Sequence, residues 1–490
     1  MLFTAFEFVF LFLPATFVGF LLLRRLAYLA GVAWLIAASL FFYAFWNAAY
    51  LWLLVPSIVV NYGLGRWLDR LAPGPGRKAV LAAGIAANLG VLAWFKYAGF
   101  LVANLDPVLG LDLAVGAIVL PLGISFITFQ KIAYLVDSYR GHASDRSFLR
   151  FALFVSFFPQ LIAGPIVHHA EIMPQLRPGR LGGPTAGQVA AGLTLFAVGM
   201  FKKVVLADGV APLANLAFGD AAQGLAPGPA AAWAGTLAYT LQLYFDFSGY
   251  SDMACGLALL FGVRLPPNFY SPYKAASIVD FWRRWHITLS RFLRDYLYIP
   301  LGGNRRGPAR RHVNLLLTMV LGGLWHGAGW TFILWGLYHG LLLLAAHAWR
   351  EGLRAPRLPR PAGVAITFLA VMLGWVLFRS ETFAAARLMF DSLAGLGGAA
   401  EAHAPSLPDW LRLAALLAAV WLLPNTVQLL RRGFLLSDAN TRRHLAEDRR
   451  PAWKRLAWRP SLAWAAAAAL CFALALMPTR PRIEFLYFQF

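Results

Sequence analysis

Long uncharged runs alternate with short basic connections along most of the chain. Residues 26–65 form forty consecutive positions without a charge, and residues 312–349 form another 38. About 20 apolar residues span a bilayer as one helix, so each of these two runs is long enough to cross twice. Further uncharged runs of spanning length cover residues 151–170, 181–201, 221–245, 361–378, 413–430 and 460–479. The pattern predicts an all-α polytopic membrane protein, because helices satisfy their own backbone hydrogen bonds in lipid.

The basic connections predict how the helices are oriented. Arginines or lysines follow the first expected helix (residues 2–23), the third and the fifth, and cytoplasmic connections carry such an excess. We therefore expect about 11 transmembrane helices, with the N- and C-termini on the periplasmic side of a bacterial inner membrane. A crossing at 187–203 is expected to lead into an outer loop at 208–229. The N-terminus lacks the basic start of a cleaved signal peptide, so we expect the first helix to stay uncleaved as a transmembrane helix.

Two segments do not fit simple crossings. Residues 151–167 are interrupted by Pro159, Gly164 and Pro165 and are followed by arginines. A broken or re-entrant helix that returns to the cytoplasmic side accounts for both features, and such backbone is tolerated where protein or water surrounds it. The run 312–349 also leaves and returns to the basic side, which predicts two limbs that meet at residues 322–327. This turn places His326 deep in the membrane.

Composition and charge narrow the class of protein. The chain is 60% hydrophobic and 13% charged, against about 25% charged residues in soluble domains. The net charge of +21 is gathered in the connections between apolar runs, which indicates membrane topology and lipid contact rather than nucleic-acid binding. Cys255 and Cys471 both lie in apolar segments, so we expect no disulfide and no metal site.

His326 is the first candidate for chemistry. It lies between Trp325 and Gly327 inside an uncharged run, and an ionisable side chain at membrane depth is a functional hypothesis by default. A neutral imidazole is the usual general base near neutral pH. The alternative is a histidine that only packs between helices. The neighbouring glycines favour a site, because they let a ligand or a second backbone approach closely.

A basic amphipathic stretch precedes this run. His286 lies in FWRRWHITLS and could orient His326 or the substrate, or could be an interfacial histidine. His339 is interpreted as structural. Four arginines recur at helical spacing, and guanidinium groups suit the phosphates of a donor such as coenzyme A; they are Arg283, Arg284, Arg291 and Arg294. The alternative for each arginine is a topology signal that contacts anionic lipid.

Acidic residues in the segment FDFSGYSD are interpreted as support rather than as catalysts. Asp246 and Tyr250 are four residues apart and share a helix face, whereas Asp252 points elsewhere. A carboxylate at this depth is costly, so we expect it to pair with an arginine or to line a wet cavity. The chain contains no Gly-x-Ser-x-Gly elbow, no phosphate-binding Gly-Lys-Ser/Thr loop and no metal-ligand spacing.

Five ordered blocks between residues 120 and 345 resemble the membrane-bound O-acyltransferase family. They read LPLGISFITFQKIAYLVDSYRG, FFPQLIAGPIVHHAEIMPQL, YFDFSGYSDMACGLALLFGVRLPPNFYSPY, FWRRWHITLSRFLRDYLYIPLGGNRRG and GGLWHGAGWTFILWGLYHG. The branch they resemble is the bacterial alginate O-acetylation membrane subunit, with relatives that serve cellulose and peptidoglycan acetylation and lipoteichoic acid D-alanylation.

The resemblance implies that the His of the WHG block, His326, is catalytic, and that the His of the FWRRWH block is His286, with Trp325 as a supporting neighbour. It also implies a cytoplasmic acyl donor, a central tunnel and an acceptor on the outer side. We expect one integral-membrane domain over residues 1–490, with a catalytic core at about 120–345 and C-terminal helices and a tail at 361–490.

The C-terminal tail, FLYFQF, resembles the aromatic C-terminal motif of D-alanylation systems, in which a tyrosine is proposed to carry the acyl group. Tyr487 follows Met477 by ten residues, a reach of roughly 33 Å when extended, whereas the bilayer midplane lies only ~15 Å from the surface. Tyr487 can therefore reach His326 and is a candidate acyl carrier. The alternative for Tyr487 is an interfacial aromatic anchor. The tail as a whole could also be the remnant of a protease tag, but Phe485 and Phe490 differ from such a tag sequence.

These observations predict an O-acetyltransferase that draws acetyl from acetyl-CoA in the cytoplasm for an extracytoplasmic polysaccharide, of the alginate type or else peptidoglycan or cellulose. A periplasmic O-acetyltransferase of the SGNH type is the expected protein partner. The alternative from another class is a transporter or flippase for lipid-linked sugars, with broken helices around a midplane site and no acyl-transfer chemistry.

Overall fold

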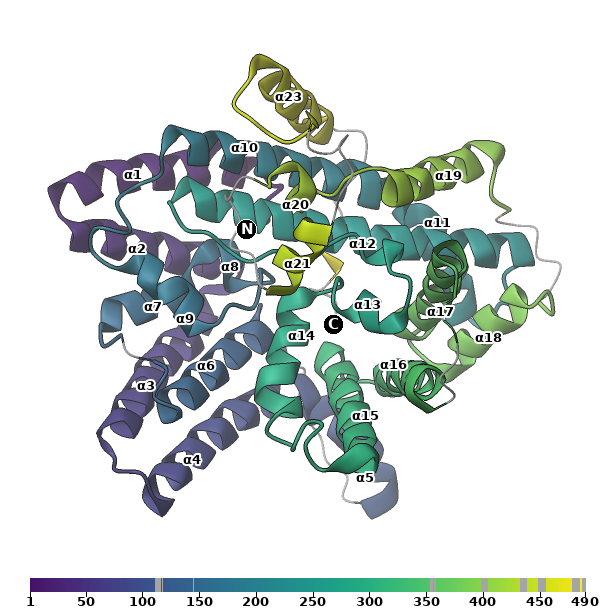
Figure 1. The fold of residues 1–490 in the computed structure, drawn as a ribbon, viewed down its shortest axis with the longest axis horizontal. Helices are drawn as coiled ribbons and strands as arrows, with labels where there is room; N and C mark the ends of the chain where they lie inside the picture. The colour runs from purple at the N-terminus through teal and green to yellow at the C-terminus, as the bar shows by residue number, and fades with distance from the viewer. Residues whose placement is uncertain are drawn as a thin grey trace.

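The computed structural model describes residues 1–110, 116, 118–143, 145–352, 356, 358–397, 404–431, 439–447, 455–477 and 485–486. Every regular element in these residues is a helix (Figure 1). Six helical stretches among them are long and apolar enough to cross a membrane: Phe8–Leu26, Tyr28–Arg70, Pro75–Leu109, Ala186–Ala222, Trp330–Glu351 and Arg360–Arg379. The all-α membrane architecture predicted from the sequence is confirmed, whereas the number of about 11 crossings stays a prediction.

The N-terminal third of the chain consists of helices that pack in pairs. Its elements are η1 (Phe8–Phe12), α1 (Leu13–Leu26), α2 (Tyr28–Asn47), η2 (Ala48–Tyr50), α3 (Leu51–Arg70), α4 (Pro75–Leu92), η3 (Ala93–Tyr97), α5 (Ala98–Leu109) and α6 (Ile124–Tyr139). Helix α1 packs against α2, and α6 packs against both α3 and α4. α4, η3 and α5 together form one long arm that ends beside α15 (described below) in Figure 1.

The middle of the chain contains the buried helix around which the others pack. Its elements are α7 (Phe148–Ser156), α8 (Phe158–Leu161), α9 (His169–Ile172), η4 (Met173–Leu176), α10 (Ala186–Phe201), η5 (Lys202–Ala207), α11 (Asp208–Ala222) and α12 (Pro229–Leu260). Helix α12 has 32 residues, nearly all buried, and packs against α10 and α11. The uncharged run 221–245 covers only about the first half of this helix.

Reciprocal glycines allow α10 and α12 to approach closely. A Cβ atom on Gly199 would lie 2.6 Å from the Gly249 carbonyl oxygen, and one on Gly249 would lie 2.7 Å from that of Gly199. Gly192 and Gly256 repeat the arrangement seven residues away along each helix. Small residues at such contacts let helix backbones pack in lipid, where no hydrophobic force drives helices together.

The sequence interpretation of this region was right in one place and wrong in another. The break predicted in residues 151–167 is confirmed, because α7 ends at Ser156, α8 has four residues, and the chain from there to His168 is not helical. The outer loop predicted at 208–229 is wrong, because α11 occupies most of it. Glycine, proline and alanine suggested a loop, but Pro212 is accommodated inside the helix, which packs on α12.

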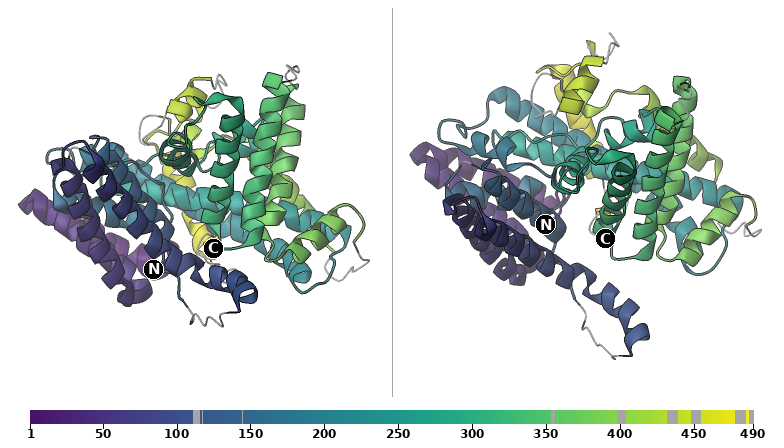
Figure 2. Two further views of the ribbon diagram at one scale, coloured as in Figure 1. Left: turned by 90° about the horizontal axis from the view of Figure 1, so that it is seen from below. Right: turned by 60° about the horizontal axis from the view of Figure 1, so that its bottom comes forward.

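The C-terminal half supplies a helical hairpin and the helices beside it. Its elements are η6 (Pro272–Lys274), α13 (Ile278–Trp282), α14 (Ile287–Leu293), η7 (Arg294–Tyr298), α15 (Gly307–His326), α16 (Trp330–His347), η8 (Ala348–Gly352), α17 (Arg360–Arg379), α18 (Phe383–Leu393), α19 (Leu407–Leu422), α20 (Thr426–Leu429), α21 (Ala439–Glu447) and α23 (Leu462–Leu476). α15 packs along α16, and α16 along α17, as the green helices of Figure 2 show.

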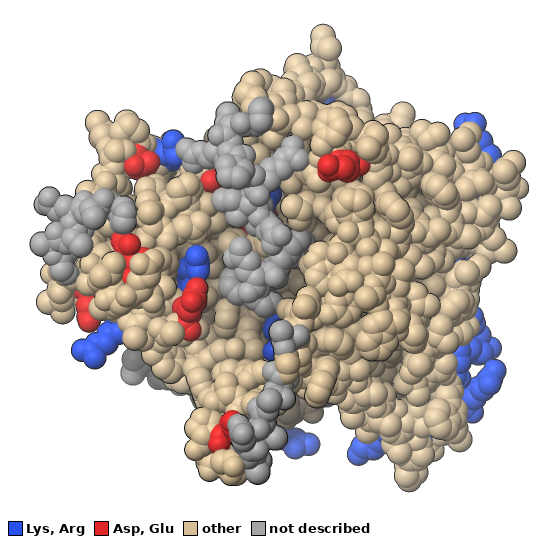
Figure 3. All heavy atoms as spheres, turned by 180° about the vertical axis from the view of Figure 1, so that it is seen from behind, with Lys and Arg blue, Asp and Glu red and all other residues tan. Residues whose placement is uncertain are grey.

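The surface agrees with a position in lipid. Seen from behind, one side of the molecule is a broad area without acidic or basic side chains, and the lysines and arginines lie mainly at its margins (Figure 3). Large apolar side chains such as Trp52, Val59 and Trp94 are at least half exposed on the helices. Apolar residues with this exposure are stable when lipid, rather than water, covers them.

Candidate active site

The hairpin of α15 and α16 positions His326. His326 is the last residue of α15, residues 327–329 form the turn, and α16 begins at Trp330. The two limbs predicted for the run 312–349 are confirmed, with the turn slightly later than predicted. The helices approach closely because Gly323 and Gly336 face each other, and a Cβ atom on either would overlap a carbonyl oxygen of the opposite helix. His326 is consequently held at the tip of a rigid hairpin.

Aromatic rings surround the His326 imidazole. Its centroid lies 5.0 Å from the Trp325 ring, 5.2 Å from the Trp335 ring and 5.2 Å from the Phe378 ring. Trp325 itself stacks on Phe129 at 5.1 Å. His326 is only 5% exposed. The ring is therefore fixed in an apolar environment from which water is largely excluded.

His286 belongs to the same cluster. Its ring centroid lies 6.5 Å from that of His326. It also packs edge-to-face with the Phe247 ring, with centroids 4.6 Å apart. His286 is fully buried and caps α14 in the left-handed conformation, with φ 40° and ψ 56°. A non-glycine residue in this region stores strain, and such residues gather at functional sites. The structure thus brings together the two histidines that the sequence singled out.

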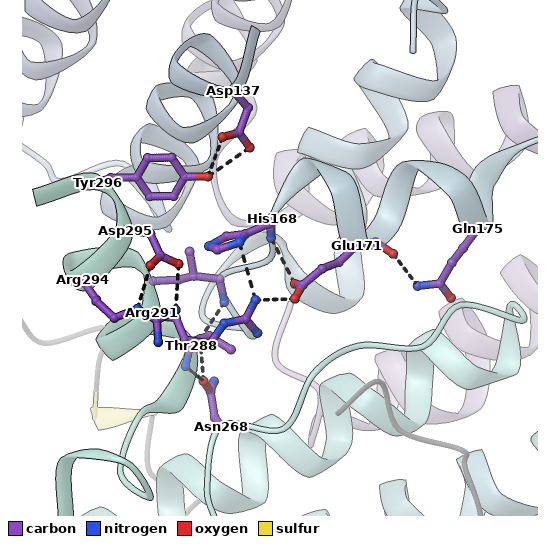
Figure 4. A network of polar contacts seen from close by, with 11 residues as sticks. Asp137, His168, Glu171, Gln175, Asn268, Thr288, Arg291, Arg294, Asp295 and Tyr296 are labelled. Atoms are coloured by element: carbon purple, nitrogen blue, oxygen red, sulfur yellow. Dashed lines mark hydrogen bonds and ion pairs between the residues drawn. The ribbon is translucent and has the colours of Figure 1, made fainter. Parts of the chain in front are cut away.

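A polar network holds the start of α14 in place. The Thr288 hydroxyl donates to the Asn268 side-chain oxygen at 2.6 Å and accepts from the Ile166 N–H at 2.9 Å. Asn268 donates in turn to the Ser251 hydroxyl on α12 at 3.1 Å. Figure 4 shows Thr288 and Asn268 beside Arg291. The broken segment after α8 is therefore part of the scaffold that fixes His286.

His326 separates two cavities. The first, of about 390 Å³, is lined by Met1, Leu2, Trp46, Lys96, Trp325 and His326 among others. The second, of about 240 Å³, is lined by Trp282, Arg294, Tyr298, Gly322, Trp335 and His326 among others. One imidazole thus forms part of the wall of both. Molecules bound in the two cavities can both reach this side chain.

Lys96 is a functional candidate that the sequence interpretation missed. It lies in η3, and its ammonium donates to the carbonyl oxygens of Trp325 at 2.6 Å and His326 at 2.9 Å. The adjacent Tyr97 hydroxyl donates to the Leu324 carbonyl at 2.8 Å. A cation suits the carbonyl end of a helix. A lysine within the apolar segment 79–105 was the signal that could have revealed it.

The four arginines predicted to hold a donor have different surroundings. Arg291 contacts the Glu171 carboxylate and lies 3.5 Å from the His168 ring nitrogen (Figure 4). Arg294 makes two hydrogen bonds to Asp295, at 2.7 and 3.0 Å, and lines the second cavity. Arg283 and Arg284 line a separate basic cavity. The structure therefore does not gather the four into one clamp.

The residues predicted as support lie deep in the protein. Asp246 is 1% exposed and accepts from Lys203 at 2.7 Å, and Lys203 also contacts Asp208 at 2.6 Å. Asp246 therefore forms an ion pair, but its partner is Lys203 and not the arginine expected from the sequence. The Tyr250 ring lies between Phe3, at 4.9 Å, and Phe485, at 4.4 Å.

The tail reaches the same interior region. Leu486 donates its backbone N–H to Asp246 at 3.1 Å, and Phe485 is 2% exposed. Tyr487 lies outside the described residues. His339, interpreted as structural, is fully buried on α16, with its ring 4.9 Å from that of Trp335. Among the residues described, no group of three or more His, Cys, Asp or Glu side chains is placed to hold a metal ion.

Comparison with known proteins gives consistent results. The family model of the membrane-bound O-acyltransferases matches residues 3–381. A peptidoglycan O-acetyltransferase of Helicobacter pylori is 45% identical, over 81% of this chain and 80% of its own. The probable alginate O-acetylase AlgI of Azotobacter vinelandii is 44% identical, over 81% and 79%. A teichoic acid D-alanyltransferase of Bacillus subtilis is 26% identical, over 54% and 69%.

Proposed function

This chain belongs to the membrane-bound O-acyltransferase family, and from that premise we propose that it transfers acetyl from cytoplasmic acetyl-CoA for O-acetylation of an extracytoplasmic polysaccharide. The observation that carries the proposal is the position of His326 in the wall of two cavities. The acceptor polymer is of the kind modified by the relatives, alginate or peptidoglycan. The flippase alternative is set aside because the family carries out acyl transfer.

His326 acts as the general base in this proposal. The oxygen of an attacking hydroxyl bonds to the thioester carbonyl carbon while the imidazole accepts the hydroxyl proton. The carbon–sulfur bond then breaks, and the imidazolium returns the proton to the leaving thiolate. The products are an acetyl ester and free coenzyme A. His286, 6.5 Å away between ring centroids, positions the imidazole or the bound substrate.

The cavities have the surroundings that each reactant needs. The second cavity contains Arg294 and Tyr298, next to the basic stretch that the positive-inside pattern places in the cytoplasm. The first contains Met1 and Leu2, which the same pattern places on the periplasmic side. In this orientation the donor enters through the second cavity and the acceptor hydroxyl through the first.

Tyr487 is the proposed first acceptor. The two residues before it, Phe485 and Leu486, are buried against Tyr250 and Asp246 of α12, which supports a tail that enters the protein rather than one that lies at the membrane surface. An acetylated Tyr487 would pass its group to a periplasmic O-acetyltransferase of the SGNH type. Tyr487→Phe removes the acceptor oxygen and retains the ring; full transfer to polysaccharide by this variant would eliminate the tyrosine carrier.

Turnover of radiolabelled acetyl-CoA by the purified protein tests the proposed function. We expect time-dependent cleavage of the thioester by the native protein and its loss in His326→Ala, with unchanged binding of coenzyme A. Binding without turnover in both proteins would contradict the proposal.

A further inference from the structure

Four arginines from three distant parts of the chain surround one cavity of about 240 Å³. Arg283 and Arg284 directly follow α13, Arg350 lies in η8, and Arg443 lies in α21. Ser277, Asp280 and His444 complete the polar part of the wall. Among the described residues that line this cavity, which we call the basic cavity, Asp280 is the one carboxylate. It already accepts a hydrogen bond from Arg284 at 2.9 Å.

The basic cavity lies on the same helices as the second cavity at His326. Trp282 lines the second cavity and the next residue, Arg283, lines the basic cavity. On the continuous helix of α16 and η8, Leu343 lines the second cavity and Arg350 lines the basic cavity. These two residues are seven positions apart, which corresponds to a rise of about 10 Å. Trp335, whose ring contacts His326, lies fifteen residues before Arg350, or roughly 22 Å along the helix. The two cavities therefore follow one seam between α13 and α16 that leads to His326.

The charge of the basic cavity favours a ligand with several negative groups. Guanidinium groups form paired hydrogen bonds with phosphate oxygens, and clustered arginines repel one another unless an anion lies between them. The described lining of the basic cavity holds four guanidinium groups and one carboxylate, and that carboxylate already accepts a hydrogen bond from Arg284. Topology alone requires basic residues on this side of the membrane, but it does not require four of them around a single cavity.

Helix α21 is fixed in position as part of this wall. The His444 ring stacks on the Tyr270 ring with centroids 5.2 Å apart, and its Nδ1 lies 3.4 Å from the Arg284 Nη2. Arg431 donates to the Leu445 carbonyl at 3.0 Å. α21 lies beyond residues 3–381, which the family model matches. The C-terminal segment therefore contributes to a site whose other residues belong to the matched region.

We propose that the basic cavity binds the diphosphate and 3′-phosphate of coenzyme A, with the pantetheine arm extended along the α13–α16 seam so that the thioester reaches His326. This assignment rests on the proposed function, since it places the donor of that reaction. Four arginines match a ligand that carries several phosphates, whereas the prosthetic group of an acyl carrier protein offers a single phosphodiester. Arg443 makes the C-terminal segment part of the donor site.

Calorimetric binding to the full-length protein in phosphatidylcholine nanodiscs tests the assignment with three probes: coenzyme A, 3′-dephospho-coenzyme A and pantetheine. Arg350→Gln and Arg443→Gln should each raise the Kd of coenzyme A by about tenfold, the loss expected for one charge-assisted contact, and leave the Kd of pantetheine unchanged. Arg387→Gln is the matched control, because this arginine is exposed on α18. Coenzyme A should bind more tightly than its dephospho form.

Two outcomes would overturn the assignment: equal Kd values of coenzyme A for the native and arginine variants, or equal affinities for coenzyme A and its dephospho form. The second outcome would show that the basic cavity does not bind the 3′-phosphate. The test is separable from that of the proposed function. Phosphate-dependent binding without turnover supports the basic cavity and contradicts acetyl transfer, whereas turnover with unaffected arginine variants does the reverse.

Discussion

The ammonium of Lys96 donates a hydrogen bond to the carbonyl oxygen of His326 across 2.9 Å. The two residues are 230 positions apart in the sequence, and their contact joins the arm formed by α4, η3 and α5 to the tip of the α15–α16 hairpin. The same ammonium contacts the Trp325 carbonyl at 2.6 Å. A positive charge at the carbonyl end of α15 thus fixes the backbone from which the imidazole projects.

Lys96→Met should lower the rate of acyl transfer more than it lowers substrate affinity. The variant keeps the length of the side chain but loses two charge-assisted hydrogen bonds, each worth about 1.5–3 kcal/mol. We expect at least a tenfold fall in kcat with little change in KM for acetyl-CoA, and partial recovery in Lys96→Arg. Lys78→Met, on the exposed start of α4, is the matched control. A larger effect on KM than on kcat would contradict a positioning role.

The backbone conformation of His286 should affect thermal stability, and its imidazole should affect activity, so that two variants can separate the two effects. Asparagine tolerates the left-handed conformation that His286 adopts, whereas alanine does not. His286→Asn is therefore expected to be more thermostable than His286→Ala, while both variants lose most of their acyl-transfer activity because both lack the imidazole. Thermal unfolding in detergent and turnover of acetyl-CoA measure the two properties. Native-like activity in His286→Ala would remove His286 from the site.

The close approach of α15 and α16 should be sensitive to one added methyl group. Gly323→Ala places a Cβ against the Phe332 carbonyl oxygen, so the helices must separate and the midpoint of thermal unfolding should fall by several degrees. Gly63→Ala is the control, because a Cβ at Gly63 would have nothing within 4 Å. Equal unfolding temperatures for the two variants would show that the hairpin is not tightly packed at this point.

Asp145 should stabilise the connection between α6 and α7 at all but acidic pH. Burial by itself would raise the pKa of Asp145, but the Arg150 guanidinium, the Ser147 N–H and Arg177 outweigh it and hold the pKa below its ordinary value. The stabilisation is therefore complete above the unfolded-state pKa of about 3.9 and is lost only as the pH falls through the lower folded-state pKa.

Comparison of the native protein with Asp145→Asn measures this contribution. The native protein should unfold at a higher temperature by the same margin from pH 5 to pH 8, a window chosen to lie above about 3.9. A margin that shrinks between pH 8 and pH 6 would contradict the assigned direction of the pKa shift.

The parts of the site that could be predicted from the sequence are those marked by local chemistry. A histidine inside an uncharged run and glycines around it indicated the hairpin and His326, because charge and chain length constrain a membrane segment strongly. The proline and glycine residues of the segment 151–167 indicated the broken helix for a similarly local reason.

The remaining features depend on contacts between distant residues. The partners of Lys96 are carbonyl groups more than 200 positions away, and no local pattern reports them. No local pattern distinguishes Arg443, and its place beside Arg283 and Arg350 follows from how α21 packs. The composition of residues 208–229 indicated a loop, but packing against α12 stabilises a helix there, as tertiary context often overrides local preference.

Acyl transfer across the membrane at His326 requires access to this position from both faces, and cysteine labelling tests this access most directly. His326→Cys would be made in a protein with Cys255 and Cys471 replaced by alanine, and sealed inside-out and right-side-out vesicles would be treated with a small membrane-impermeant thiol reagent. We predict that the thiol is modified in both kinds of vesicle, because the side chain lines both cavities. Modification in only one orientation, or in neither, would contradict the transfer of an acyl group across the membrane at this residue.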